Sequence, residues 1–255
     1  MRISILILNL SFIFCTINFI DSSENIYNTD NEYELITLPT FEINSDIADS
    51  RRFKYGHKYD VNLGIHNSGI WYTSNQANDI WRIAIESIDA YALKIQFNEI
   101  YLPEYSKLFI YNESRDMIYG PYSSSDINSG SFSSPLIKGD KVIIEYIQPN
   151  LVREKVKLNI NSIIHDYTDI FNFSNETRDR DCGENVVCDT AEDFRDQANS
   201  LIYMVINEYT CSASLINNAN NDNTPYVLTA WHCIVGETNL GEHNDFVYYF
   251  NHESP

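Results

Sequence analysis

Apolar and polar residues alternate with a period of two along much of the chain. Trp81, Ile83 and Ile85 share one face of an extended segment. The same spacing recurs in segments further along: Leu93, Ile95 and Phe97; Leu108 and Ile110; Val142, Ile144 and Tyr146; Val156, Leu158 and Ile160. Because successive side chains of a strand point to opposite faces, this alternation predicts half-buried β-strands.

Short polar stretches with turn chemistry separate these segments, at residues 111–114, 123–134 and 138–140. No segment of comparable length with helical periodicity precedes residue 165. Several short strands joined by such turns are typical of an antiparallel sandwich. We therefore predict an all-β fold that begins with an antiparallel β-sandwich-like domain over residues 23–165.

The first residues indicate export. Residues 3–20 are mostly apolar and follow Arg2, and the chain turns polar from Asp21 onward. This pattern is typical of a secretory signal peptide. A membrane anchor is the alternative, but polar residues interrupt the run, whereas a spanning helix needs about 20 apolar residues. We expect a signal peptide over residues 1–22, a secreted protein, and no membrane association after cleavage.

Charge and composition exclude further classes. The chain has 36 acidic and 17 basic side chains, and its formal net charge is −19. Such a surplus of negative charge repels polyanions, so we expect no nucleic acid partner. Hydrophobic residues make up 44% and aromatic residues 13% of the chain, which argues against global disorder.

A polar run over residues 166–181 predicts an exposed linker that proteases can reach. The domain that follows, residues 182–255, holds four cysteines. In an oxidising compartment these cysteines are expected to be disulfide partners. A zinc site is the alternative, but the sequence has no C-x-x-C pair, and we expect no metal and no cofactor. The four cysteines are Cys182, Cys188, Cys211 and Cys233.

His232 is the candidate for chemistry. It follows an apolar, strand-like segment from Tyr226 to Leu228 and directly precedes Cys233. A general base must hold its ring in one orientation, so a histidine on a rigid support suits that role. On these residues alone, a histidine beside a cysteine is more often structural. The other histidines have no H-E-x-x-H or similar spacing and are interpreted as surface or core residues.

Two strings of sequence carry a family resemblance. C-S-A-S-L-I-N-N from Cys211, followed by Y-V-L-T-A-W-H-C up to Cys233, closely resembles the catalytic-histidine region of trypsin-like serine endopeptidases. D-C-G-E-N-V-V-C from Asp181 resembles the mature start of the bacterial lysyl endopeptidase branch. Looser motifs upstream, W-R-I-A-I from Trp81 and G-D-K-V-I-I-E-Y from Gly139, resemble that branch's precursor.

The resemblance implies an exported zymogen. A β-rich prosegment would occupy residues 23–165, and residues 182–255 would form the first part of a trypsin-like double β-barrel. By motif position His232 is the triad base, and Cys211 with Cys233 is its supporting disulfide. The counterparts of Cys182 and Cys188 resemble positions that pair with cysteines farther along, so here they are unpaired or bonded to each other. Trp231 departs from the family at a position where relatives usually carry alanine or another residue.

The rest of the triad is missing from the sequence. In this fold the order is His, then Asp, then Ser. Asp245 falls where the resemblance predicts a strand, and Ser254 has no G-D-S-G-G segment around it. The resemblance therefore implies a truncated protease domain that lacks the triad Asp and Ser. We expect no peptidase activity from this chain by itself, and protein or peptide substrates only if a C-terminal part completes it.

Two other functions stay open. One is a non-catalytic secreted binding module, a β-sandwich with aromatic-rich loops in a sequence that has 18 tyrosines. The other is a metal or thiol enzyme that uses Cys233 with His232. A reactive thiolate must be free and accessible, and the expected disulfide at Cys233 argues against this last possibility.

Overall fold

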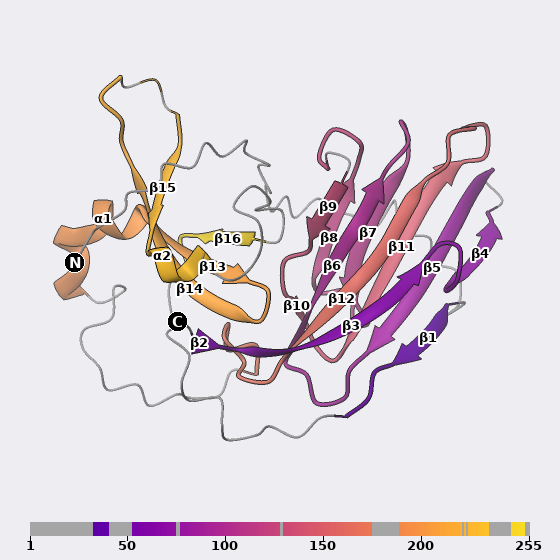
Figure 1. The fold of residues 1–255 in the computed structure, drawn as a ribbon, viewed down its shortest axis with the longest axis horizontal. Coiled ribbons are helices and arrows are strands. Elements are labelled where there is room, and N and C mark those ends of the chain that lie inside the picture. The colour runs from indigo at the N-terminus through magenta and orange to yellow at the C-terminus, as the bar shows by residue number, and fades with distance from the viewer. Residues whose placement is uncertain are drawn as a thin grey trace. The chain divides into compact units, whose positions relative to one another are not determined.

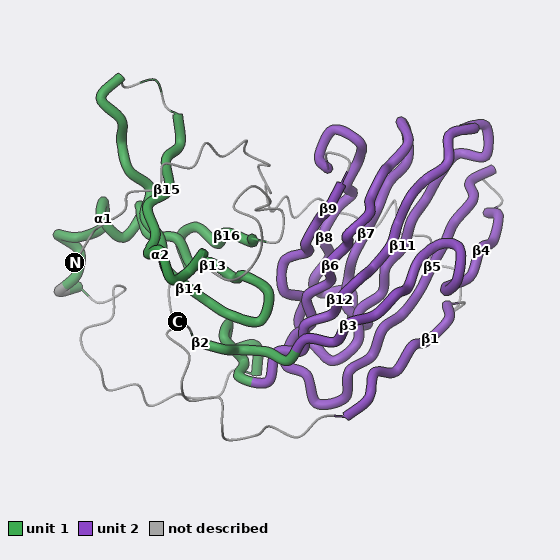
Figure 2. The backbone as a smooth tube through the Cα atoms, viewed as in Figure 1, with its two compact units in different colours: residues 1–12, 43–57, 168–255 green, residues 13–42, 58–167 purple. Residues whose placement is uncertain are grey.

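A computed structural model describes residues 33–40, 53–74, 77–127, 130–174, 189–220, 222, 224–234 and 246–252. Strands dominate these ranges, and the prediction of an all-β fold is confirmed (Figure 1). The chain divides into two compact units (Figure 2). The described residues of the sandwich unit are 33–40 and 58–167, and those of the C-terminal unit are 53–57 and 168–252.

The sandwich unit consists of two sheets. Its strands are β1 (Glu34–Thr37), β3 (Gly56–Gly64, which begins in the C-terminal unit), β4 (Ile70–Thr73), β5 (Asn78–Glu86), β6 (Ala92–Tyr101), β7 (Lys107–Asn112), β8 (Ile118–Tyr122), β9 (Gly130–Ser133), β10 (Ile137–Lys138), β11 (Lys141–Pro149) and β12 (Lys157–Asp166). One sheet has the order β1-β5-β11-β7-β8, with β4 also on β5. The other has the order β10-β6-β12-β3, with β9 also on β6.

The core of the sandwich unit lies between the two sheets. It contains every residue whose alternation predicted a strand, from Trp81 in β5 to Ile160 in β12. Strands β5 and β11, β11 and β7, and β6 and β12 pair antiparallel, as the sequence predicts. β1 differs, because it runs parallel to β5, with Glu34 opposite Ile83. Alternation fixes which face a residue occupies but not the direction of the neighbouring strand.

The central strands of the first sheet are buried on both faces, whereas alternation predicts only one buried face. A second apolar cluster covers the outer face: Ile80, Ala84, Phe109, Tyr111, Ile143 and Ile147. An ion pair lies on the same face, where Arg82 Nε donates to Glu145 Oε2 at 2.8 Å. Both side chains are almost fully buried, and the Tyr111 hydroxyl donates to the same oxygen at 3.0 Å. The charged residues in these strands therefore do not indicate a solvent-exposed face.

The C-terminal unit contains one open sheet. Its elements are β2 (Phe53–Lys54), a 3-10 helix (Asp189–Phe194), α1 (Arg195–Asn199), β13 (Leu201–Ile206), β14 (Tyr209–Ile216), β15 (Tyr226–Thr229), α2 (Trp231–Ile234) and β16 (Phe246–Phe250). The strand order is β15-β14-β13-β16, and β2 also pairs with β14. A small apolar core covers one face and includes Ile202, Met204, Val227 and Ile234. The described strands do not close into a barrel.

Part of the segment that the sequence analysis treats as an exposed linker is packed. Asp169 is buried and accepts a hydrogen bond from the Phe173 amide at 2.7 Å. The Phe171 ring lies 4.6 Å from the Tyr249 ring and 5.7 Å from the Tyr203 ring, measured between centroids. The aromatic side chain draws this stretch onto the sheet, because burying an aromatic ring stabilises more than leaving it in water.

Several predictions from the sequence fall outside the described residues: the signal peptide over residues 1–22, residues 175–181 of the linker, Cys182, Cys188, Asp245 and Ser254. None of the helices within the described ranges is long and apolar enough to cross a membrane.

Candidate functional site

Strand β15 carries the chain to His232. It pairs antiparallel with β14, where Val227 lies opposite Leu215 and Thr229 lies opposite Ala213. The Thr229 hydroxyl also donates to the Ser212 carbonyl oxygen at 2.9 Å, which fixes the last residue of the strand to its neighbour. The chain therefore leaves the sheet at a defined point, directly before the histidine.

A single helical turn, α2, follows the strand. The Cys233 amide donates to the Ala230 carbonyl oxygen at 3.0 Å, which closes the turn. Cys233 and Ile234 are buried in the apolar core of the C-terminal unit, whereas Trp231 and His232 are exposed. The turn is thus anchored on its apolar side and presents the imidazole on its outer side.

A disulfide ties this turn to the middle of the sheet. Cys233 bonds to Cys211 in β14, and their Cα atoms are 6.1 Å apart. Cys211 contacts the same apolar core, and the bridge spans 22 positions in the sequence. The disulfide implied by the family resemblance is present.

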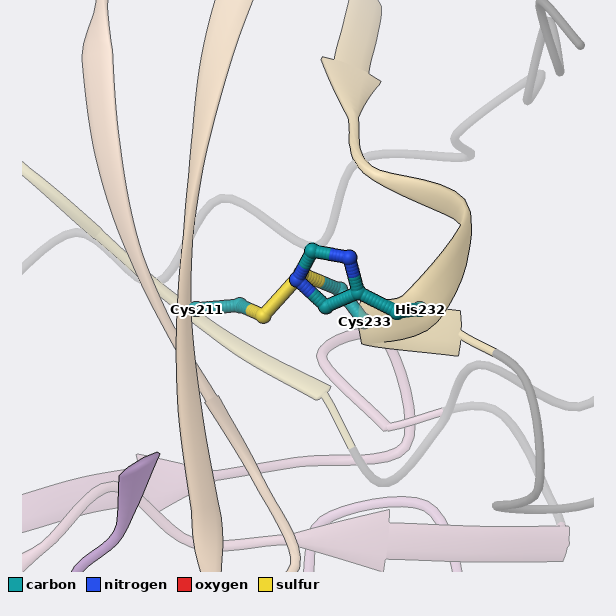
Figure 3. Close-up of side chains that lie close together, drawn as sticks. All are labelled: Cys211, His232 and Cys233. Atoms are coloured by element: carbon teal, nitrogen blue, oxygen red, sulfur yellow. A yellow bond between two sulfur atoms is a disulfide. The ribbon is translucent and has the colours of Figure 1, made fainter. Parts of the chain in front are cut away.

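The imidazole of His232 lies beside this bridge (Figure 3). A ring nitrogen and the two sulfur atoms all lie within 4.8 Å of one another. Within the described part of the chain, the His232 ring makes no hydrogen bond to an aspartate or a serine. The arrangement therefore offers a supported, accessible base with no orienting carboxylate among the described residues.

A metal or thiol centre at Cys233 and His232, with Cys211 beside them, is the alternative use of this site. A metal-binding or nucleophilic cysteine must be a thiolate. Both sulfur atoms are held in the disulfide, so the His232 ring nitrogen is the only one of the three atoms that could bind a metal ion strongly. One imidazole does not make a zinc site, so the oxidised site does not fit a metal.

A pocket of about 490 Å³ lies elsewhere in the C-terminal unit. Tyr203 and Thr210 of its lining alternate along their strands with Met204 and Cys211, so it opens on the sheet face opposite the core and the disulfide. The described residues that line it are Phe53, Ile170, Tyr203, Thr210 and His252. Burial lowers the pKa of His252, whose ring meets the Phe171 ring edge to face with the centroids 4.8 Å apart. This pocket is separate from the His232 site.

The sequence analysis missed the aromatic cluster on this face. Tyr203 lies between Ile202 and Met204 in β13, so its side chain points to the opposite face of the sheet. An aromatic residue at this position indicates that the opposite face is also packed. On the core side, burial raises the pKa of Tyr248 to about 12. Side chains therefore pack on both faces of the sheet around β14, the strand that holds Cys211.

Part of the C-terminal sequence is similar to a family of peptidases, which are hydrolases that act on proteins. Residues 177–255 match the family described as lysyl endopeptidase, C-terminal domain. The matched range includes β13 to β16, the disulfide and His232, and it leaves out the sandwich unit and β2. This agrees with the motif resemblance in the same stretch of sequence.

Proposed function

We propose that the chain is the N-terminal portion of a secreted, lysyl endopeptidase-like serine endopeptidase precursor, and that His232 is its general base. The observation that carries the proposal is an exposed imidazole held by the Cys211–Cys233 disulfide within a segment that matches this peptidase family. In the proposed reaction, the His232 ring would take the proton of a serine hydroxyl as that oxygen attacks the peptide carbonyl. It would then give the proton to the leaving amine.

The 255-residue chain has no peptidase activity of its own under this proposal. A triad base acts only together with a nucleophile and an orienting carboxylate, and loss of the serine or the histidine alone reduces turnover by roughly 10⁶-fold. Asp245 and Ser254 are not proposed to fill these roles. Residues 182–255 would be the histidine-bearing part of the protease, and residues 23–165 the prosegment, which is cut away in the linker at residues 166–181.

A chimera tests this function. Residues 1–255 are joined to the second half of a lysyl endopeptidase that supplies the aspartate, the serine and the substrate pocket. We expect the chimera to hydrolyse a chromogenic lysyl amide, and the 255-residue chain to give neither turnover nor a burst sensitive to serine reagents. A soluble chimera that forms the Cys211–Cys233 bond but cleaves no lysyl amide would count against the proposal, as would a burst from the chain alone.

A further inference from the structure

One edge of β14 is shared between two strands. β15 pairs with the second half of β14, from Ala213 to Ile216. β2 pairs with the first two residues of β14 (Figure 1). In this pairing Lys54 lies opposite Tyr209 and Phe53 lies opposite Thr210. β2 therefore ends its pairing next to Cys211, whose disulfide partner Cys233 is adjacent to His232. The extended segment β2 thus lies on the edge of β14, against residues that are close in sequence to Cys211 and its disulfide with the neighbour of His232.

The residue after β2 is fixed to the turn between β13 and β14. The Tyr55 amide donates to the Glu208 carbonyl oxygen at 2.9 Å, and the Tyr55 hydroxyl donates to the Asn207 carbonyl oxygen at 2.8 Å. Tyr55 is fully buried, and the Thr168 hydroxyl donates to its carbonyl oxygen at 3.3 Å. Asn207 has a φ of 48°, which is typical of the tight turns that join hairpin strands. The carbonyl oxygens of this turn therefore accept hydrogen bonds from the segment that pairs with β14.

The side chain of Lys54 meets an acidic and an aromatic partner. Its ammonium nitrogen lies 3.4 Å from a Glu208 carboxylate oxygen and 5.8 Å from the centre of the Tyr209 ring. The Lys54 side chain is 24% exposed and that of Glu208 is 19% exposed, so both charges are partly withdrawn from water. A carboxylate and an aromatic face together favour a cation and repel an acidic side chain.

We propose that Glu208, Tyr209 and the adjoining edge of β14 form a peptide-binding subsite that takes an extended segment with a lysine followed by an aromatic residue. In this chain β2 and Tyr55 occupy it. Glu208 and Tyr209 belong to the peptidase-matched range, whereas β2 lies outside it, so the occupant comes from the proposed prosegment. Peptides commonly bind to sheet edges as an added strand, with side-chain pockets that give specificity. The inference rests on the proposed function only in taking this edge as the one along which peptides reach His232.

Hydrogen exchange of the amides of residues 53–57, measured on the full chain by mass spectrometry, tests the subsite. Lys54→Glu or Glu208→Lys alone places like charges together, and each is expected to raise the exchange rate roughly three- to fivefold, the size expected for a partly exposed ion pair. The double variant restores the opposite charges and should return the rate to within about twofold of the parent. Lys58→Glu is the matched control, because Lys58 pairs with Asp60 at 3.5 Å in β3 and not with β14.

A peptide in trans tests the recognition directly. Arg-Phe-Lys-Tyr-Gly-His, added at millimolar concentration, should compete with β2 and speed exchange at residues 53–57, whereas the same peptide with Glu in place of Lys should not. Equal effects of the two peptides, or single and double charge variants that exchange alike, would overturn the proposal. His232→Gln is expected to leave all these rates unchanged. Failure of the subsite is therefore distinguishable from failure of the catalytic role.

Discussion

At the scale of single residues, the site depends on where one helical turn places its side chains. The buried Cys233 and the exposed His232 are neighbours in sequence but face opposite environments. The bond to Cys211 prevents the turn from rotating away from the sheet. The backbone position of His232 is thus set by a covalent contact of the adjacent residue.

Removing this bond should loosen the C-terminal unit. A bridge across 22 positions restricts the unfolded chain, and by loop entropy it contributes about 3 kcal/mol. We expect the Cys211→Ser, Cys233→Ser double variant to lose roughly that free energy of unfolding in urea. Trp231→Ala, at an exposed position of the same turn, is the control and should change the free energy by about 0.5 kcal/mol or less. A double variant as stable as the parent would show that packing alone holds the turn.

At the scale of elements, two histidines at the periphery of the C-terminal unit have pKa values below the ordinary value for histidine. Burial lowers the pKa of His57, the positive charge of Lys54 lowers it further, and the negative charge of Glu208 acts in the opposite direction. Burial also lowers the pKa of His252. Both residues bind a proton more readily in the unfolded chain than in the folded one.

The C-terminal unit should therefore become less stable in acid. The contribution of these histidines is fully present above the unfolded pKa of about 6.5 and is lost as the pH falls through the lower folded values. We expect exchange of the β13 and β14 amides to quicken between pH 7 and pH 5 beyond the intrinsic change. In the His57→Asn, His252→Asn double variant this pH dependence should be reduced. An unchanged dependence in that variant would assign the effect to carboxylates instead.

The sequence predicts the elements better than their surroundings. Trp81, Ile83 and Ile85 were assignable to a core face because alternation alone determines which residues share a side of a strand. Arg82 and Glu145 fall on the other face, and their burial follows from their lying opposite each other in the β5–β11 pairing, which no single-strand pattern contains. A charged residue in a strand normally predicts an exposed position, and it can be buried only where an oppositely charged partner lies beside it.

The candidate site shows the same division. The motif around Cys211 and His232 predicted the disulfide, because the residues involved are close in sequence and form a specific string. The docking of Tyr55 and Phe171 onto the sheet was not predictable, because they come from opposite ends of a long insertion in the sequence. Contacts of such long separation depend on the fold of everything between them.

At the scale of the whole molecule, the two units interleave in the sequence: β1 of the sandwich unit precedes β2, and residues 58–167 of the sandwich unit lie between β2 and the remainder of the C-terminal unit. The range that matches the peptidase family begins at residue 177. Residues 168–174 precede this range, and Phe171 among them packs on the sheet against Tyr203. Removal of the proposed prosegment would therefore cut the chain downstream of segments that contact the sheet of the C-terminal unit.

N-terminal sequencing of the secreted protein checks this processing. We expect a new N-terminus within residues 178–181, where the polar linker offers a cleavable stretch before Cys182. Finding only the signal-peptide cut would argue against a prosegment. Replacing Arg178 and Arg180 with Gln tests whether a basic residue directs the cut, with Lys155→Gln as the control outside the linker.

The role of His232 is the central claim, and the kinetics of the lysyl endopeptidase chimera test it most directly. The measurement is kcat/KM on a lysyl amide for the parent chimera and for its His232→Gln variant, with His252→Gln as the matched control. The account predicts a loss of about 10⁴-fold or more for His232→Gln, because the proton of the nucleophile then has no acceptor, and a change of less than about tenfold for the control. A His232→Gln chimera that keeps the parent's kcat/KM would contradict it.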